Sequence, residues 1–103
     1  MNHPTPERSG FYYSLGVAYY ALGQFESAIE GYDEAVRINP KYSEAYHNRG
    51  NVYHDLGQNV RAIEDYDQAI QHNSQYSAAY NNRGIAYYDL GEHWRSVNDY
   101  DEA

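Results

Sequence analysis

The sequence predicts an all-α solenoid in which antiparallel helix-turn-helix units stack side by side, and three observations support this. The stretch 46–69 returns 34 residues later and, more loosely, 34 residues earlier. Apolar residues in the second half of each copy follow the three-and-four spacing of a helix that buries one face. Glycine also recurs directly after a leucine, at Gly23, Gly57 and Gly91. A fixed period of this length is typical of repeat architectures, and it predicts about six helices.

The elements can be justified in chain order. Thr5, Pro6 and Glu7 predict a helix start, since a hydroxyl cap, a proline and an acid suit the first turn. The first helix then runs over about 6–22, and Gly23 ends it because glycine adopts the left-handed conformation without a Cβ penalty. The same reasoning gives second helices over about 25–39 and 59–73 and from 93 to the end. The expected divisions are a tail and helix start at 1–8, then repeats at 9–42, 43–76 and 77–103.

Small and large residues alternate in the repeat in a way that predicts how each pair packs. Gly16, Gly50 and Gly84 let the two helices approach closely, and tyrosines fill the space beside them. The third copy has Ser96 where the others have alanine, so we expect it to pack less well. The third copy also stops part-way through its second helix. We therefore expect either a fragment of a longer protein or an edge covered by another chain.

Composition narrows the class of protein. The 103 residues carry 15 acidic and 7 basic side chains, a formal charge of −8, which argues against nucleic acid because phosphate binding needs a basic surface. The chain has no cysteine, so an intracellular, cytoplasmic setting is the default expectation. No stretch is apolar enough for membrane insertion. No catalytic motif, metal site or cofactor site is apparent, and we expect a protein that is not an enzyme.

The first copy resembles the tetratricopeptide repeat. In that family an aromatic residue, a Leu-Gly pair and a tyrosine precede an alanine, an aromatic residue and a proline. The residues that carry the resemblance are Tyr12, Leu15, Gly16, Tyr19, Ala28, Tyr32 and Pro40. The resemblance covers about 9–103, and it implies a right-handed α-solenoid whose first helices line a concave groove for a protein or peptide partner. Its shared residues are packing residues, so it is specific for fold and weak for function.

The predicted groove is rich in aromatic and amide side chains, which offer contact area and two-way hydrogen bonding. Its expected residues are Tyr13, Val17, Tyr20, His47, Asn48, Asn51, His54, Asp55, Asn81, Asn82, Ile85, Tyr88 and Asp89. His47 and His54 lie two turns apart, about 10 Å along the axis, too far to chelate one metal directly. We expect them to be exposed in the groove and sensitive to mild acid.

Asn48 and Asn82 occupy the same level of consecutive repeats. This is similar to the asparagine ladder with which some repeat arms hold a peptide main chain, although Ser14 interrupts it in the first copy. The alternative is that both belong to a common repeat variant and bind nothing. Family members that clamp a terminal carboxylate use Lys, Asn and Arg at positions that match Tyr13, Val17, Asn48, Ala78 and Asn82 here. Only Asn48 keeps the required type, so we expect no such clamp.

Two substitutions relative to the first copy occur together. Where the first copy has Leu15 the others have Arg49 and Arg83, and where it has Gly31 they have Asp65 and Asp99. We predict that each arginine reaches the aspartate on the second helix of its own repeat, as a partly buried ion pair.

These observations favour a scaffold that binds a peptide of a partner protein. Two alternatives remain open. The chain could be a self-assembly module, a homo-oligomer through its C-terminal edge, or it could be the substrate-recognition arm of a larger enzyme.

Overall fold

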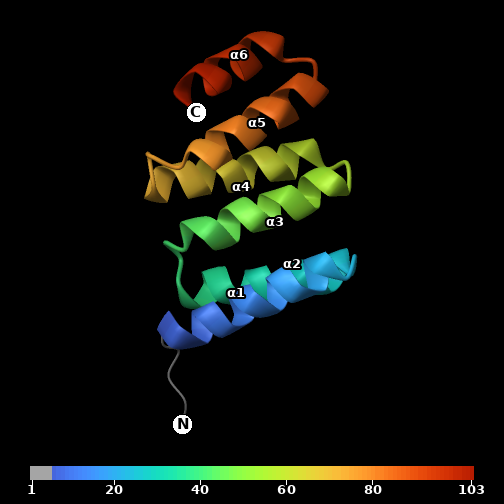
Figure 1. Cartoon of the computed structure of the whole chain (residues 1–103), viewed down its shortest axis with the longest axis vertical. Coiled ribbons are helices and arrows are strands. Elements are labelled where there is room, and N and C mark those ends of the chain that lie inside the picture. Colours follow the sequence, from blue (N-terminus) through green and yellow to red (C-terminus); the bar gives the residue numbers. More distant parts are fainter. Residues whose placement is uncertain (1–5) are drawn as a thin grey trace.

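The computed structural model describes residues 6–103, and within that range it contains six α-helices and no strand. They are α1 (Pro6–Ala21), α2 (Phe25–Ile38), α3 (Ser43–Asp55), α4 (Asn59–His72), α5 (Ser77–Asp89) and α6 (His93–Glu102). Figure 1 shows them stacked as antiparallel pairs along one axis of a molecule of 50 × 27 × 17 Å. The all-α solenoid prediction is confirmed. The predicted cap at Thr5 and most of the predicted tail lie outside the described residues.

Glycine ends the first helix of each pair, as predicted. Gly23, Gly57 and Gly91 have φ of 74°, 78° and 82°, the left-handed region that favours glycine. At the first of these turns the Gln24 amide donates to the Tyr19 carbonyl at 2.9 Å, and the Gly23 amide donates to Tyr20 at 2.9 Å. These two bonds form a Schellman cap, which satisfies the last carbonyls of the helix and reverses the chain.

Within each pair, a tyrosine on the second helix packs on a glycine of the first. A Cβ added to Gly16 would lie 2.5 Å from the Tyr32 ring, and one added to Gly50 would lie 2.8 Å from the Tyr66 ring. Both rings are buried, at 1% and 2% exposure. The glycines therefore set the distance between the helices of a pair.

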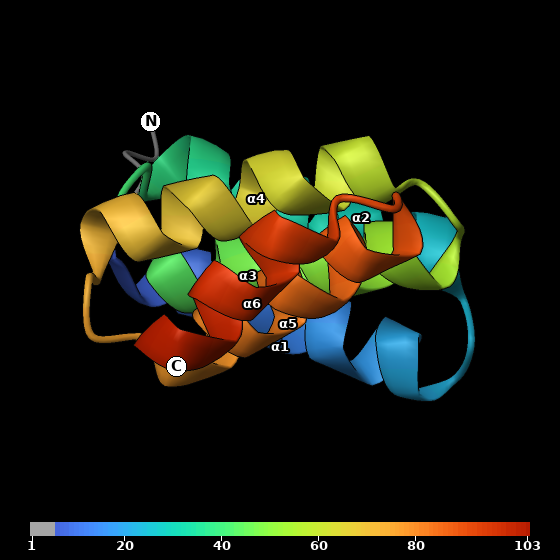
Figure 2. The ribbon, with the colours of Figure 1, turned by 90° about the horizontal axis from the view of Figure 1, so that it is seen from above.

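The first helices contact one another, whereas the second helices do not. Between the described helices, α1 contacts α3 and α3 contacts α5, but no such contact joins α2 to α4 or α4 to α6. Seen along the stack in Figure 2, α2 and α4 lie along one side, and α1 and α5 lie along the other. The first helices therefore line the inner side of the curve. No described helix combines the length and apolar character needed to cross a bilayer.

The third repeat differs from the first two in one buried polar group and in a more exposed outer face. Ser96 replaces the buried alanines at 28 and 62, and its Oγ is buried with no hydrogen-bond partner among the described residues. Tyr100 is 44% exposed, although its counterparts Tyr32 and Tyr66 are covered by the repeat that follows each of them. The outer face of α6 is therefore open.

Candidate peptide-binding groove

Side-chain bonds join successive first helices across the inner side of the stack, and their partners are 35 residues apart. Asn48 Nδ2 donates to the Tyr13 hydroxyl at 2.9 Å, and Tyr20 donates its hydroxyl proton to Asp55. The next junction repeats both bonds with other residues. Because the period is 34, each residue contacts the position after its own counterpart in the next repeat. We call these bonds the inner rungs.

The second pair of inner rungs uses histidine in place of tyrosine. Asn82 Nδ2 lies 2.8 Å from His47 Nε2, and His54 Nε2 lies 2.8 Å from Asp89 Oδ2. Both junctions therefore place an asparagine and an aspartate of the later helix against ring groups of the earlier one. Eight of the thirteen predicted groove residues therefore take part in the inner rungs between repeats.

The prediction that His47 is exposed is wrong. Its side chain lies between α4 and α5, and the residue is only 8% exposed. Its Nδ1 is 3.1 Å from the Tyr76 hydroxyl, and the Tyr76 ring centroid is 4.9 Å from the imidazole. Burial lowers the pKa of His47, against smaller opposing effects of Asn48 and Glu44. The sequence could not show this, because the ring that covers His47 comes from the turn before the next repeat.

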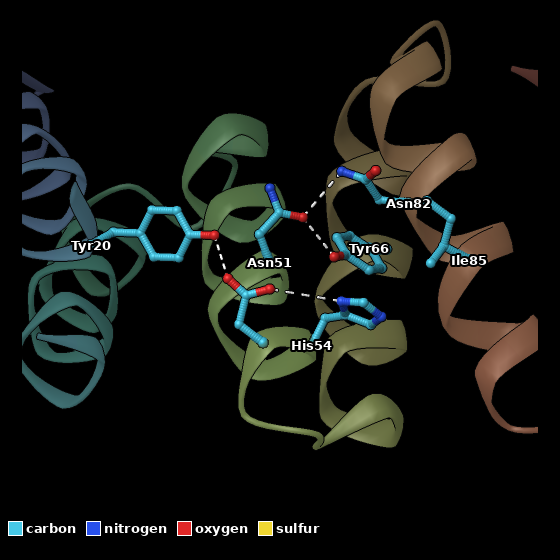
Figure 3. A pocket seen from close by; sticks show the side chains of 7 residues that line it. Tyr20, Asn51, His54, Tyr66, Asn82 and Ile85 are labelled. Carbon is cyan, nitrogen blue, oxygen red and sulfur yellow. Dashed lines mark hydrogen bonds and ion pairs between the residues drawn. The ribbon is translucent and has the colours of Figure 1, made fainter. Parts of the chain in front are cut away.

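His47 is part of a polar network in which each amide hydrogen of Asn82 has an acceptor. One is His47 Nε2, and the other is Asn51 Oδ1 at 3.1 Å. The same Asn51 oxygen accepts the Tyr66 hydroxyl at 2.6 Å, as Figure 3 shows. With Nε2 accepting from Asn82, the neutral imidazole carries its proton on Nδ1 and donates it to Tyr76. The network suits a neutral histidine.

A pocket of about 250 Å³ opens on the inner side beside this network. It draws on α1, α3, α4 and α5, and Figure 3 shows Ile85 at its apolar edge and Tyr20 on the opposite side. The hydrogen bond to Asp55, together with burial, raises the pKa of Tyr20 to about 12. The lining residues are Tyr20, Asn51, His54, Asp55, Tyr66, Asn82 and Ile85.

The structure thus brings six of the predicted groove residues together in one pocket, and the other seven do not line it. Tyr13, His47 and Asn48 belong to the rungs above. Val17 is 41% exposed, and Tyr88 is 58% exposed and stacks on His93 at 4.6 Å between ring centroids. Tyr66 lines the pocket but was not predicted, because its 34-residue period marked it as a packing residue. Within residues 6–103, no three His, Asp or Glu side chains are grouped so that they could hold a metal ion.

The arginines on α3 and α5 meet the predicted aspartates. Arg49 Nε and Nη2 lie 2.9 and 2.7 Å from the two oxygens of Asp65, and Arg83 lies 2.8 and 2.6 Å from those of Asp99. Both pairs are bidentate, and both aspartate side chains are only 6% exposed. This geometry fixes the guanidinium plane as well as neutralising the buried charge.

Each arginine also makes a contact that sequence reasoning missed. Arg49 Nη1 lies 2.8 Å from Asp33, and Arg83 Nη1 lies 2.8 Å from Asp67, each on the preceding repeat. The signal was present in the sequence, because an aspartate recurs at 33, 67 and 101. These contacts, which we call the outer rungs, join the second helix of one repeat to the first helix of the next.

Comparisons with known proteins agree with this architecture. No curated protein matches the chain. Among solved structures, MamA is 28% identical with a TM-score of 0.90, over 95% of this chain and 57% of MamA. The second TPR of Spaghetti (RPAP3), bound to the HSP90 peptide SRMEEVD, is 25% identical with a TM-score of 0.92, over 94% of this chain and 90% of that one. The Sgt2 TPR domain from Aspergillus fumigatus is 31% identical with a TM-score of 0.89, over 96% of this chain and 65% of that one.

The family comparison covers most of the chain. The TPR repeat family matches residues 16–57 and 50–91, two overlapping stretches that together include the pocket and the Arg49–Asp65 pair. The fold, the 34-residue period and this match agree, and the chain belongs to the tetratricopeptide repeat family.

Proposed function

We propose that this chain is a non-enzymatic scaffold that binds a peptide segment of a partner protein on its inner side, in the groove around Tyr20, His54 and Ile85. The observation that carries the proposal is the pocket, which is concave and combines an apolar edge with several polar groups. A domain of the same fold holds an HSP90 peptide. That likeness supports the class of ligand and not its identity.

The charge of the groove favours a neutral or basic peptide. Asp55 and Asp89 have side chains 38% and 42% exposed on this face. The positions that would clamp a terminal carboxylate carry no cation, and both arginines are turned toward aspartates on the second helices. An acidic peptide would therefore meet like charge, which opposes binding.

The asparagine ladder stays a prediction, and the inner rungs limit it. Asn48 and Asn82 already donate their Nδ2 groups to Tyr13 and to His47 and Asn51. A peptide main chain that used these amides would have to compete with those bonds. We therefore propose that recognition depends more on the pocket than on the ladder.

Ile85 offers the sharpest test, because it lines the pocket and takes no part in a rung. We would select short random peptides against the intact chain from a display library and measure their affinities for Ile85→Lys and Ile85→Glu. For basic peptides, Ile85→Lys should weaken binding by roughly tenfold or more, about 1.4 kcal/mol. Ile85→Glu should retain more of the affinity, since it adds to the negative charge of the groove.

Gln71→Ala is the matched control, since Gln71 is exposed on α4 and away from the pocket. Its affinity should equal that of the original chain. Thermal unfolding of each variant would show that the fold is retained. The proposal would be lost if the selected peptides bound both Ile85 variants as well as the original chain, or if selection gave mainly acidic sequences.

A further inference from the structure

The outer face of α6 lacks the cover that matching faces of the first two repeats receive. Val97 is 57% exposed and Tyr100 is 44% exposed, whereas their counterparts Ile63 and Tyr66 are 9% and 2% exposed. An exposed apolar face does not by itself identify a partner. The polar side chains beside this face indicate which kind of helix would fit it.

Both repeat junctions use the same three contacts. The later first helix supplies an asparagine, the arginine that follows it, and an aspartate six residues after the arginine. In α3 these are Asn48, Arg49 and Asp55, and in α5 they are Asn82, Arg83 and Asp89. The earlier repeat supplies two inner-rung partners and one outer-rung aspartate.

The third repeat has residues at the three positions that the earlier repeat contributes to each junction. By the 34-residue period they are Asn81, Tyr88 and Asp101. All three residues are exposed, and no hydrogen bond or ion pair engages their side-chain polar groups among the described residues. They lie on α5 and α6, around the exposed apolar side chains.

We propose that this face is a docking surface for a further helix that carries an asparagine, the next residue arginine, and an aspartate six residues after that arginine. In the arrangement of the two existing junctions, the asparagine would bond Asn81, the arginine would pair with Asp101, and the aspartate would accept the Tyr88 hydroxyl. Val97 and Tyr100 supply the apolar contact, and the three polar pairs set the register.

The pattern also argues against a second copy that docks through its own α1. The matching positions of α1 are Ser14, Leu15 and Ala21. They give no cation for Asp101 and no carboxylate for Tyr88. The Asn-Arg-Asp sets of α3 and α5 are already engaged inside the stack. The helix that fits therefore differs from α1 at these three positions.

The test supplies such a helix in register. A second copy of residues 70–103, joined after Ala103, continues the period and places copies of Asn82, Arg83 and Asp89 opposite the three unpaired groups. Tyr100→Trp in a Trp94→Phe background reports docking, because Tyr66 at the matching position is covered by the next repeat, whereas Val60, which matches Trp94, stays 62% exposed. We expect the emission of this single tryptophan to shift to the blue in the extended chain, with the appended tryptophan changed to phenylalanine.

The pairing is tested with Asp101→Asn in both chains. In the original chain the thermal midpoint should not move, whereas in the extended chain it should fall on the order of 2–4 °C. Glu102→Gln is the matched control, since Glu102 is an exposed neighbour outside the pattern, and it should have no effect in either chain. With the appended arginine changed to leucine, the residue α1 has at Leu15, Asp101→Asn should also have no effect.

Three results would overturn the proposal. One is an equal effect of Asp101→Asn in the two chains. Another is an effect of Glu102→Gln in the extended chain as large as that of Asp101→Asn. The last is a blue shift of the Tyr100→Trp reporter, placed in the chain without the added repeat, that grows with the concentration of that chain, because it would show that a second copy without the pattern covers α6.

Discussion

Arg83 Nη1 and Asp67 Oδ1 lie 2.8 Å apart across the boundary between the second and third repeats. The same guanidinium holds Asp99 inside the third repeat through its two other nitrogens. One side chain thus closes a helical pair and attaches that pair to its neighbour, and Arg49 does the same one repeat earlier. Stability within repeats and stability between them are therefore coupled.

Removal of Arg49 should be far more harmful than removal of its outer-rung partner. Arg49→Ala leaves the buried Asp65 carboxylate unpaired, which should lower the free energy of unfolding by about 3–5 kcal/mol. Asp33, whose side chain is 53% exposed, should contribute only about 0–1 kcal/mol. A double-mutant cycle of Arg49→Ala and Asp65→Ala, followed by urea unfolding, should show strong non-additivity. Additive losses would contradict a direct pairing.

The glycines beneath the tyrosine rings give a graded prediction. Gly50→Ala forces a Cβ against the buried Tyr66 ring and should destabilise the chain by about 1–3 kcal/mol. In Gly84→Ala the nearest ring is Tyr100, at 3.0 Å, and that ring is partly exposed and can move aside, so the loss should be smaller. Gly10→Ala is the control, because its Cβ would meet nothing within 4 Å, and it should stabilise α1 by roughly 0.5–1 kcal/mol. Equal losses at 50 and 84 in thermal unfolding would count against this packing.

The buried hydroxyl of Ser96 should make the third repeat less stable than it would be with alanine at this position. Ser96→Ala removes an Oγ that has no partner and restores the alanine of the other repeats, so the free energy of unfolding should rise by about 1 kcal/mol or more. The reverse change, Ala62→Ser, should lower it. Chemical denaturation of both variants would check the pair, and a loss of stability in Ser96→Ala would show that the hydroxyl is bonded after all.

The buried His47 predicts a dependence of stability on pH. Its pKa is lowered in the folded state, while in the unfolded chain it is about 6.5. Below pH 6.5 the unfolded state therefore binds more protons than the folded state, and the free energy of unfolding should fall as the pH drops through 6.5 toward the folded pKa. A proton on Nε2 would also face the amide of Asn82.

Unfolding curves between neutral pH and pH 5 would measure this dependence. His47→Gln should flatten it, whereas His72→Gln, which keeps His47, should leave its contribution in place. If the slope were the same in His47→Gln as in the original chain, His47 would not be its source.

Much of the fold could be predicted because the same residue types recur at the same positions of successive repeats. The glycine at each helix end, the glycine and tyrosine facing one another, and the Arg49 and Asp65 positions that change together all recur at fixed spacing. The first two are local or lie within one pair, and the third is a contact between residues 16 apart. Contacts of this kind form within a single helical pair, so they can be predicted without knowing how successive pairs are arranged.

The groove was harder to predict, because its contacts cross between repeats. Its residues were identified by projecting one face of each first helix, and that projection cannot tell a free side chain from one that meets the next repeat. His47 shows the difference, since Tyr76 and Asn82 cover it from outside its own helix. The offset of one residue between partners, 35 against a period of 34, depends on how the pairs are inclined in space, and a single sequence does not encode that visibly.

The inner and outer rungs have a consequence for how such an array can change length. If residues 43–76 were excised, Tyr13 would meet Asn82, Asp33 would meet Arg83, and Tyr20 would meet Asp89, each a pairing of the kind already present. Loss or duplication of a 34-codon segment of the gene would therefore rejoin compatible surfaces without any compensating substitution.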